Sequence, residues 1–427
     1  MKRLTSLLAA ALLAAAVVSL TGAPAVAAPP TGACRDPEPA HPVVAERPWA
    51  QLLLDPRRVW PHSTGAGVLI AVVDSGVDAD HPQLRSPGKV LPGRDFFLVG
   101  ELPGSFDCVS HGTAVASIAA ADPVDGVGFH GVAPGARILP VRITDRELSD
   151  GGRPTPIDRA VLARGIRFAA DQGARVINLS LSGYQDDAAV RDAVAYAVGK
   201  DALVVAAVGN RQGEAGTDMS YPAAYDGVLG VGSLDITGTR TGSSQVGDYV
   251  DLVAPGQGVL GATRVAGHDH WDGTSFAAPF VAGTAALVRS AWPELSAAQV
   301  ARRLLATATP APGGRAEYGA GVVDPYRAVT DGLSVQAPGD LPAVVEPVPD
   351  PAAVRAAAWW DAAGANARRA AGAVALGLLV ALGLGWALSR GRRRGWLPGR
   401  AAPQPVPPVR EEPPEQMFLL PPPPAER

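Results

Sequence analysis

The chain has 427 residues, of which 47% are hydrophobic, and it carries a formal net charge of −4 at pH 7. This length is enough for one large domain with appendages or for two domains, and the apolar share favours a globular core. The near balance of charges, with no basic stripe interleaved with aromatic residues, argues against a nucleic-acid partner and against any strongly charged partner.

Residues 1–28 have the pattern of an export signal. Two basic residues precede an apolar run from Leu4 to Leu20, and small side chains end the segment. This order is typical of a signal peptide, so we expect cleavage after Ala27 or Ala28. The alternative is that the segment remains as an uncleaved N-terminal anchor.

Residues 29–65 are rich in proline and lack a long periodic stretch, so we expect an extended arm lying on another part of the protein. The chain has only two cysteines, Cys34 in this arm and Cys108 beyond it. In an exported protein we expect such a pair to form a disulfide, and two cysteines alone cannot build a metal site. Closing a loop of about 74 residues would remove roughly 4 kcal/mol of unfolded-state entropy in the chain-entropy model.

Residues 66–330 alternate between short β-branched runs and alanine-rich segments, which predicts one large domain. Strands are expected at 68–73, 138–143, 174–181, 203–208 and 228–231, and helices at 111–121, 157–172, 187–198, 275–290 and 297–306. Apolar strands that alternate with helices form a mostly parallel sheet, because each crossover places a helix on one face. The predicted fold class is therefore α/β, with helices on both faces of the sheet.

The chain after residue 330 is expected to leave this domain. Residues 331–369 are predicted to form a proline-rich linker, and 370–389 contain no charge over a length that lets a helix, rising ~1.5 Å per residue, cross ~30 Å of hydrocarbon. The alternative for 370–389 is a buried helix of a soluble domain. Residues 390–427 are predicted to be a proline-rich cytoplasmic tail, with the domain outside, because arginines follow the span at Arg390, Arg392, Arg393, Arg394 and Arg400.

An aspartate ends the first predicted strand, in the segment Val72-Val73-Asp74-Ser75-Gly76. Its carboxylate is expected at the carboxyl edge of the sheet, where open α/β folds gather their sites. The alternative is an aspartate that caps the following turn, as Asp78 or Asp80 could also do.

His111 is expected to begin a helix. The small residues that follow it, Gly112 and Thr113, would let this helix pack closely beneath a cleft that His111 faces. The other histidines of the chain lack such a setting. An isolated histidine could equally be structural or solvated.

Ser275 lies in a turn that enters a predicted helix, between Gly273-Thr274 and Phe276-Ala277-Ala278-Pro279. The unpaired N–H groups and partial positive charge of a helix start favour an oxyanion forming beside the serine. Asn210 ends another buried strand, and its amide could donate a hydrogen bond to the same oxyanion. The alternatives are a plain N-cap serine and an ordinary turn asparagine.

An acid, a base and a nucleophile thus occur in the order Asp, His, Ser. A hydroxyl is a poor nucleophile at neutral pH, but an imidazole can take its proton and a carboxylate can hold that imidazole in the right tautomer. Together, the three segments resemble the signature blocks of the subtilisin-like (S8) serine proteases, over residues 65–330. The resemblance implies that Asp74 orients His111, that His111 is the general base and then the general acid, that Ser275 is the nucleophile and that Asn210 belongs to the oxyanion hole.

The segment Ile177-Asn178-Leu179-Ser180-Leu181-Ser182-Gly183 resembles the family's strand that pairs with an extended peptide substrate. The resemblance implies substrate contacts at Ser180, Leu181, Ser182 and Gly183. Ser182 stands where the family pattern has glycine, so we expect a narrower pocket for the residue before the scissile bond. Plain strand packing is the alternative.

The whole layout is similar to the mycosins, membrane-anchored subtilisin-like proteases of type VII secretion systems in actinobacteria. The similarity rests on Arg47-Pro48-Trp49-Ala50, Gly65-Ala66-Gly67, the block Asp272-Gly273-Thr274-Ser275-Phe276, the two cysteines and the C-terminal span. It implies an arm that wraps the catalytic domain and a disulfide between Cys34 and Cys108.

We therefore expect a membrane-anchored serine endopeptidase that works outside the cytoplasm on exported proteins, in association with a type VII secretion membrane complex. The alternative is a structural subunit that stabilises a secretion complex, with proteolysis secondary. An esterase would use the same chemistry, but no Gly-x-Ser-x-Gly segment surrounds Ser275. No cluster of oxygen ligands for calcium is evident, so we expect no metal and no cofactor.

Overall fold

The computed structural model describes residues 32–34, 37–98, 101–145, 157–212, 219–333 and 351–396. The predicted signal peptide, most of the predicted linker before residue 351 and the tail beyond residue 396 lie outside the described residues. The chain divides into two compact units, Met1–Val335 and Gln336–Arg427.

A parallel sheet of seven strands lies at the centre of the first unit, in the order β2-β3-β1-β4-β5-β6-β7. An antiparallel hairpin, β8–β9, lies apart from it. The predicted α/β class and parallel sheet are confirmed. The strands are β1 Leu69–Asp74, β2 Arg94–Asp95, β3 Arg137–Arg142, β4 Val176–Leu179, β5 Leu203–Ala207, β6 Val228–Leu234, β7 Leu252–Pro255, β8 Val259–Ala262 and β9 His268–Trp271.

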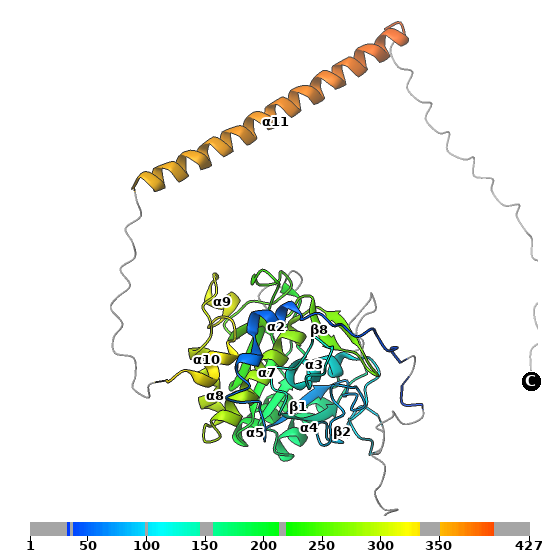
Figure 1. Cartoon of the computed structure of the whole chain (residues 1–427). Coiled ribbons are helices and arrows are strands. Elements are labelled where there is room, and N and C mark those ends of the chain that lie inside the picture. The colour runs from blue at the N-terminus through cyan, green and yellow to red at the C-terminus, as the bar shows by residue number, and fades with distance from the viewer. Residues whose placement is uncertain are drawn as a thin grey trace, which may run out of the picture. The chain divides into compact units, whose positions relative to one another are not determined.

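Helices cover both faces of the sheet (Figure 1). Helices α3, α7, α8 and α10 share one hydrophobic core, and α4 and α5 share the other. Each predicted helix is present, with its ends shifted by a few residues at most. The helices are α2 Trp49–Leu54, the short 3₁₀ helix η1 Pro56–Arg58, α3 His111–Ala120, α4 Arg159–Asp171, α5 Ala188–Gly199, α7 Thr274–Ala291, α8 Ala297–Ala306, α9 Arg315–Tyr318 and α10 Pro325–Thr330.

Strand β1 shows why helices are needed on both sides. Successive side chains of a strand point to opposite faces. Ile70 and Val72 belong to the core on one face, and Ala71 and Val73 belong to the core on the other. All four are fully buried, so the strand is apolar throughout and both faces must be covered.

The predicted arm is more ordered than its sequence indicates, because α2 and η1 fall inside 29–65. Ala50 of α2 is fully buried in the core shared with α3 and α7. The indole nitrogens of Trp49 and Trp60 donate to the carbonyl oxygens of Gly258 and Val132, each at 3.0 Å. The second half of the arm is therefore part of the core of the first unit.

The first half of the arm is extended and follows the hairpin β8–β9. The His41 N–H donates to the Ala266 carbonyl at 3.0 Å, and the His268 N–H donates to the Pro42 carbonyl at 3.1 Å. Near its beginning, Cys34 forms a disulfide with Cys108, a residue shortly before α3. Both ends of the arm are thus joined to the segments around α3.

The second unit contains one long helix, α11, Pro351–Arg393 (Figure 1). Its part Ala358–Arg393 contains a window of mean hydropathy 2.1 and is long and apolar enough to cross a membrane. The helix begins inside 331–369, so from residue 351 onward a helix replaces the predicted linker. Alanine-rich sequence favours this, since alanine has the highest intrinsic helix propensity.

Candidate active site

The end of β1 and the start of α3 bring an acid and a base together. The Nδ1 atom of His111 lies 2.7 Å from Oδ1 of Asp74, and the two residues are 5% and 4% exposed. A carboxylate can only accept, so in the neutral ring Nδ1 carries the proton and Nε2 is left as an acceptor. The contact therefore selects the tautomer that a general base requires.

A glycine permits this close approach. A Cβ atom on Gly112 would lie 2.0 Å from the carbonyl oxygen of Gly76 and 3.2 Å from the Asp74 Cβ. Any side chain at this position would push the first turn of α3 away from the end of β1. The small residue after His111 thus has a definite steric role.

Ser275 lies in the first turn of α7 and lines the same cavity as Asp74 and His111, which has a volume of about 370 Å³. The Nε2 atom of His111 is buried and has no hydrogen-bond partner among the described residues, so the Ser275 hydroxyl does not bond to it here. Such contacts are often long before substrate binds. The imidazole packs edge-on against Phe276, with ring centroids 5.0 Å apart.

Electrostatics favour a charged imidazolium at His111. Burial opposes the charged form, but the Asp74 carboxylate, through its charge and its hydrogen bond, and the charge of Asp107 outweigh burial and raise the pKa of His111 above its ordinary value. The site is therefore suited to receive a proton at this ring.

The side chain of Asn210, which follows the end of β5, is oriented by Thr274. Its Oδ1 atom accepts from the Thr274 N–H at 2.8 Å and from Thr274 Oγ1 at 3.0 Å. These bonds occupy the amide oxygen, so the Nδ2 donor remains for another acceptor. Asn210 lines the same cavity as Ser275. A Cβ atom on Gly273, whose φ is 129°, would lie 2.8 Å from Nδ2, so glycine is needed there.

The residues of the segment after β4 differ in whether they line the cavity. Ser180, Leu181 and Ser182 line it, and Ser180 Oγ donates to the Ser275 carbonyl at 2.5 Å. The N–H and C=O of Gly183 pair with Tyr221 at 2.7 Å in both directions. The Gly183 backbone is therefore engaged within the protein, whereas its neighbours reach the cavity.

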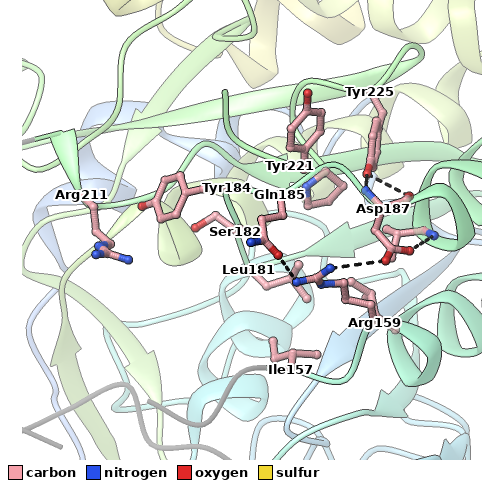
Figure 2. Close-up of a pocket in the computed structure, with 14 residues that line it drawn as sticks. Ile157, Arg159, Leu181, Ser182, Tyr184, Gln185, Asp187, Arg211, Tyr221 and Tyr225 are labelled. Atoms are coloured by element: carbon pink, nitrogen blue, oxygen red, sulfur yellow. Dashed lines mark hydrogen bonds and ion pairs between the residues drawn. The ribbon is translucent and has the colours of Figure 1, made fainter. Parts of the chain in front are cut away.

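A second cavity of about 410 Å³ adjoins the first, and both are lined by Leu181, Ser182 and Tyr184. Figure 2 shows Arg211 beside Tyr184 at one end of this cavity and Tyr225 beside Asp187 at the other. Sequence reasoning did not identify this cavity. A local signal existed for two of its lining residues, since Tyr184 directly follows Gly183 and Arg211 directly follows Asn210. Tyr221 and Tyr225 are distant in the sequence from every predicted site residue.

One group of side chains could hold a cation. His41 lies between Glu38 and Asp269, with Nε2 to Oε1 at 3.2 Å and Nδ1 to Oδ2 at 3.5 Å. Each ring nitrogen faces a carboxylate, and the imidazole can donate to both carboxylates only when both of its nitrogens carry a proton. The expectation that no metal is needed stays a prediction, which an unchanged melting temperature in a chelator would support.

An imidazole fixed by a buried carboxylate, in a cavity with a serine at a helix start, defines a serine protease of the α/β type. The subtilase family model matches residues 65–322, more than half of the chain, and the chain belongs to this family.

Several relatives are mycosins. The chain is 36% identical to mycosin-1 of Mycobacterium tuberculosis over 400 residues, covering 80% of this chain and 84% of the relative. It is 36% identical to thermitase of Thermoactinomyces vulgaris over 291 residues, covering 68% of this chain and 99% of the relative. The crystal structure of MycP1 from Mycobacterium smegmatis matches with a TM-score of 0.59 at 32% identity, covering 76% of this chain and 98% of that structure.

Proposed function

We propose that this protease is a membrane-anchored endopeptidase that cleaves exported proteins outside the cytoplasm, with Asp74, His111 and Ser275 as its catalytic residues. The proposal depends above all on one observation, the 2.7 Å contact between His111 Nδ1 and Asp74 Oδ1. This contact leaves Nε2 as the acceptor in a cavity that Ser275 also lines.

The acylation step follows from this arrangement. As Ser275 Oγ attacks the carbonyl carbon of the scissile bond, its proton passes to His111 Nε2, and the imidazolium is stabilised by Asp74. The negative charge on the substrate oxygen is stabilised by Asn210 Nδ2 and by N–H groups at the start of α7. The C–N bond then breaks as Nε2 returns the proton to the leaving amine.

Deacylation repeats the same steps with water. His111 takes a proton from water, whose oxygen attacks the acyl carbon, and then returns the proton to Ser275 Oγ. The raised pKa of His111 helps here, because the ring must carry a proton briefly in each half of the reaction.

The proposed location in the membrane is supported by helix α11 and by the relatives. Four arginines end the described part of α11 or follow it directly, at Arg390, Arg392, Arg393 and Arg394. Such a cluster is retained on the cytoplasmic side, which would place the catalytic domain on the outer side. Solved relatives are described as proteases of type VII secretion systems, so we propose the same context for this chain.

A serine-directed fluorophosphonate tests the enzyme directly. We expect the full-length chain to be labelled and Ser275→Ala to be unlabelled. Ser290→Ala is a matched control, because Ser290 lies on the same helix and donates only to the Ala66 carbonyl at 2.9 Å in the described structure. Equal labelling of the Ser275→Ala chain, or no labelling of the native chain, would contradict the proposal.

A structural role in a secretion complex is the second candidate. It is favoured by one relative of solved structure, the serine protease MycP1, which is described as an essential component of the type VII (ESX-1) secretion system. Replacing the chromosomal gene by the Ser275→Ala form separates the two roles. Secretion that survives this change but fails on deletion of the protein would show that the structural role is the main one.

A further inference from the structure

Asp107 is a buried carboxylate that the proposed mechanism does not use. It lies in the loop before α3, and only 1% of its surface is exposed. A buried carboxylate is costly unless hydrogen bonds and nearby charges compensate for the loss of water. The groups that donate hydrogen bonds to this carboxylate therefore indicate the role of its charge.

One oxygen of this carboxylate is directed at the segment that follows Asp74. Oδ1 of Asp107 accepts from Ser75 Oγ at 3.0 Å and from the Val109 N–H at 3.0 Å. The same Ser75 oxygen accepts from the Gly112 N–H at 2.9 Å. Asp107 is thus joined through one hydroxyl to the turn after β1 and to the first turn of α3.

The other oxygen is directed at α3 itself. Oδ2 of Asp107 accepts from the Thr113 N–H at 2.9 Å and from Thr113 Oγ1 at 2.7 Å. The Thr113 hydroxyl in turn accepts from the Asp78 N–H at 3.0 Å. One carboxylate therefore joins the two segments that carry the acid and the base.

The N–H groups at the start of a helix lack intrahelical acceptors, and the negative charge of Asp107 lies beside them. Four other charged or titratable groups surround it. Asp74 and His111 interact with it through their charges, Arg142 Nε donates to the Ser75 carbonyl at 3.0 Å, and Arg264 Nε donates to the Asp107 carbonyl at 3.0 Å. Arg142 also pairs with the carboxylates of Asp95 and Asp145. Among the described residues, the donors to the Asp107 carboxylate are Ser75, Val109 and Thr113. Burial raises the pKa of this carboxyl to about 6, against the hydrogen bonds from Thr113 and Val109, so its negative charge is present at neutral pH.

We propose that Asp107 is a positioning residue of this protease, which fixes the end of β1 against the start of α3 and adds negative charge behind the imidazole of His111. This inference rests on the proposed function, because it concerns the efficiency of the same acid–base pair. Asp107 touches neither the substrate nor the reacting atoms, and it acts through Ser75 and Thr113.

Asp107→Asn is the sharpest test, because it keeps the shape and removes the charge. An amide offers one oxygen, whereas the site presents backbone N–H donors to both positions, from Val109 and from Thr113. In either orientation of the amide, its NH₂ group therefore faces a backbone N–H donor and cannot accept a hydrogen bond from it. The partly buried Asp251, which accepts the Gly230 N–H at 2.9 Å on the other side of the sheet centre, provides the matched control Asp251→Asn.

Two changes are expected together in Asp107→Asn and not in Asp251→Asn. The kcat for a peptide substrate should fall about 10- to 100-fold with KM changed less than about twofold, because the reacting groups lose alignment and the substrate contacts do not. The acid limb of the kcat/KM profile should move to lower pH, because His111 loses a neighbouring negative charge.

Each other outcome overturns the inference. Unchanged kcat would show that the pair does not need Asp107, and a fall in kcat with an unmoved acid limb would show a merely structural residue. If Asp107→Asn does not fold, Ser75→Ala removes one link with no loss of charge and should lower kcat alone, by a smaller factor. An unchanged kcat in Ser75→Ala would then overturn the inference.

Fluorophosphonate labelling separates this inference from the proposed function. A native chain that is not labelled contradicts the function, whatever Asp107 does. A native chain that is labelled, with an Asp107→Asn variant labelled at the same rate across the same pH range, contradicts the inference alone.

Discussion

The two halves of the candidate site are built from different chemistry. The half at β1 and α3 holds three buried ionisable groups: Asp74 and His111 share a hydrogen bond of 2.7 Å, and Asp107 interacts with both through charge. The half at β5 and α7 holds Ser275 and Asn210, whose contacts are with neutral groups: the Ser275 carbonyl accepts from Ser180 Oγ, and Asn210 Oδ1 accepts from the Thr274 N–H. The acid–base half therefore depends on pH, whereas the nucleophile half depends on steric fit.

The arm adds to this difference. Cys34 bonds to Cys108, which stands between Asp107 and α3, and the Glu38 N–H donates to the Cys108 carbonyl at 3.2 Å. Arg264 donates to the carbonyls of both Glu38 and Asp107. The first half of the arm thus braces the acid–base half, whereas its second half contacts α7, since Ser63 Oγ donates to the Leu287 carbonyl at 2.7 Å.

Removing the disulfide should have the largest effect on stability. The double change Cys34→Ser and Cys108→Ser should lower the free energy of unfolding by up to about 4 kcal/mol, because the unfolded chain is no longer closed into a long loop. Denaturant unfolding of the full-length protein in detergent measures this. A reducing agent should destabilise the native chain and leave the double variant unchanged. Equal unfolding midpoints for the native chain and the double variant, both measured without reductant, would contradict the expectation.

Asn210→Ala tests the nucleophile half. Loss of one oxyanion donor costs roughly 10²–10³ in kcat when measured in subtilisin, and we expect the same range here. The acid limb of the pH profile should stay in place, because the side chain carries no charge, in contrast to the shift expected from Asp107→Asn. A shifted acid limb would show that the two halves are electrostatically coupled, against the distinction drawn above.

Mild acid should weaken the contact between the arm and the hairpin. Burial, with a contribution from the charge of His81, lowers the pKa of His268 from 6.5 to about 4, and the His268 ring accepts the Val44 N–H at 3.3 Å. As pH falls from 6.5 towards 4, the unfolded chain gains a proton that the folded chain cannot, so stability decreases, by about 2 kcal/mol near pH 5.

Unfolding midpoints measured across this pH range check the effect. His268→Gln should reduce the pH dependence and leave the part that arises from His81 and His130, whose pKa values burial also lowers. His62→Gln, at an exposed position, is the control and should leave the dependence as it is. Parallel curves for the native chain and His268→Gln would contradict the assignment to this ring.

Gly273→Ala should have the smallest effect of the four, about a tenfold fall in kcat. The new methyl group would lie 2.8 Å from Asn210 Nδ2 and would require a φ of 129°, which disfavours any residue except glycine. Gly242→Ala is the control, since no atom of the described residues lies within 4 Å of the added atom. Equal kcat values for the two variants would show that Asn210 can move aside without loss.

The elements that the sequence predicts best are those with strong local signals. Helix α8 agrees with its predicted ends, and Ser296 and Gln299 form a capping box at its start. The sequence does not predict β2, β7, β8 or β9. Strand β2 has only two residues, and β7, β8 and β9 have four each without the longer apolar run that contains β4; β7 also ends at Pro255, and β9 is partly polar. Helix α2 was missed for a similar reason, since it has six residues and no side-chain cap.

The site likewise contains residues that a local sequence pattern predicts and contacts that no local pattern predicts. Asp74, His111, Ser275 and Asn210 each stand at the end or start of an element with a recognisable local pattern, and all four line one cavity. The contacts of Asp107 with Ser75 and Thr113 were not predicted, because they depend on how β1 and α3 meet in space. Likewise, the engagement of Gly183 with Tyr221 arises from a pairing between distant segments that no local pattern shows.

The bond between Cys34 and Cys108 also determines how proteolytic cleavage of this region would be detected. A single nick by another enzyme anywhere between these cysteines would sever the backbone and still release nothing, because the two pieces share a covalent crosslink. Electrophoresis without reductant would show one intact band, and the fragments would separate only after a thiol is added.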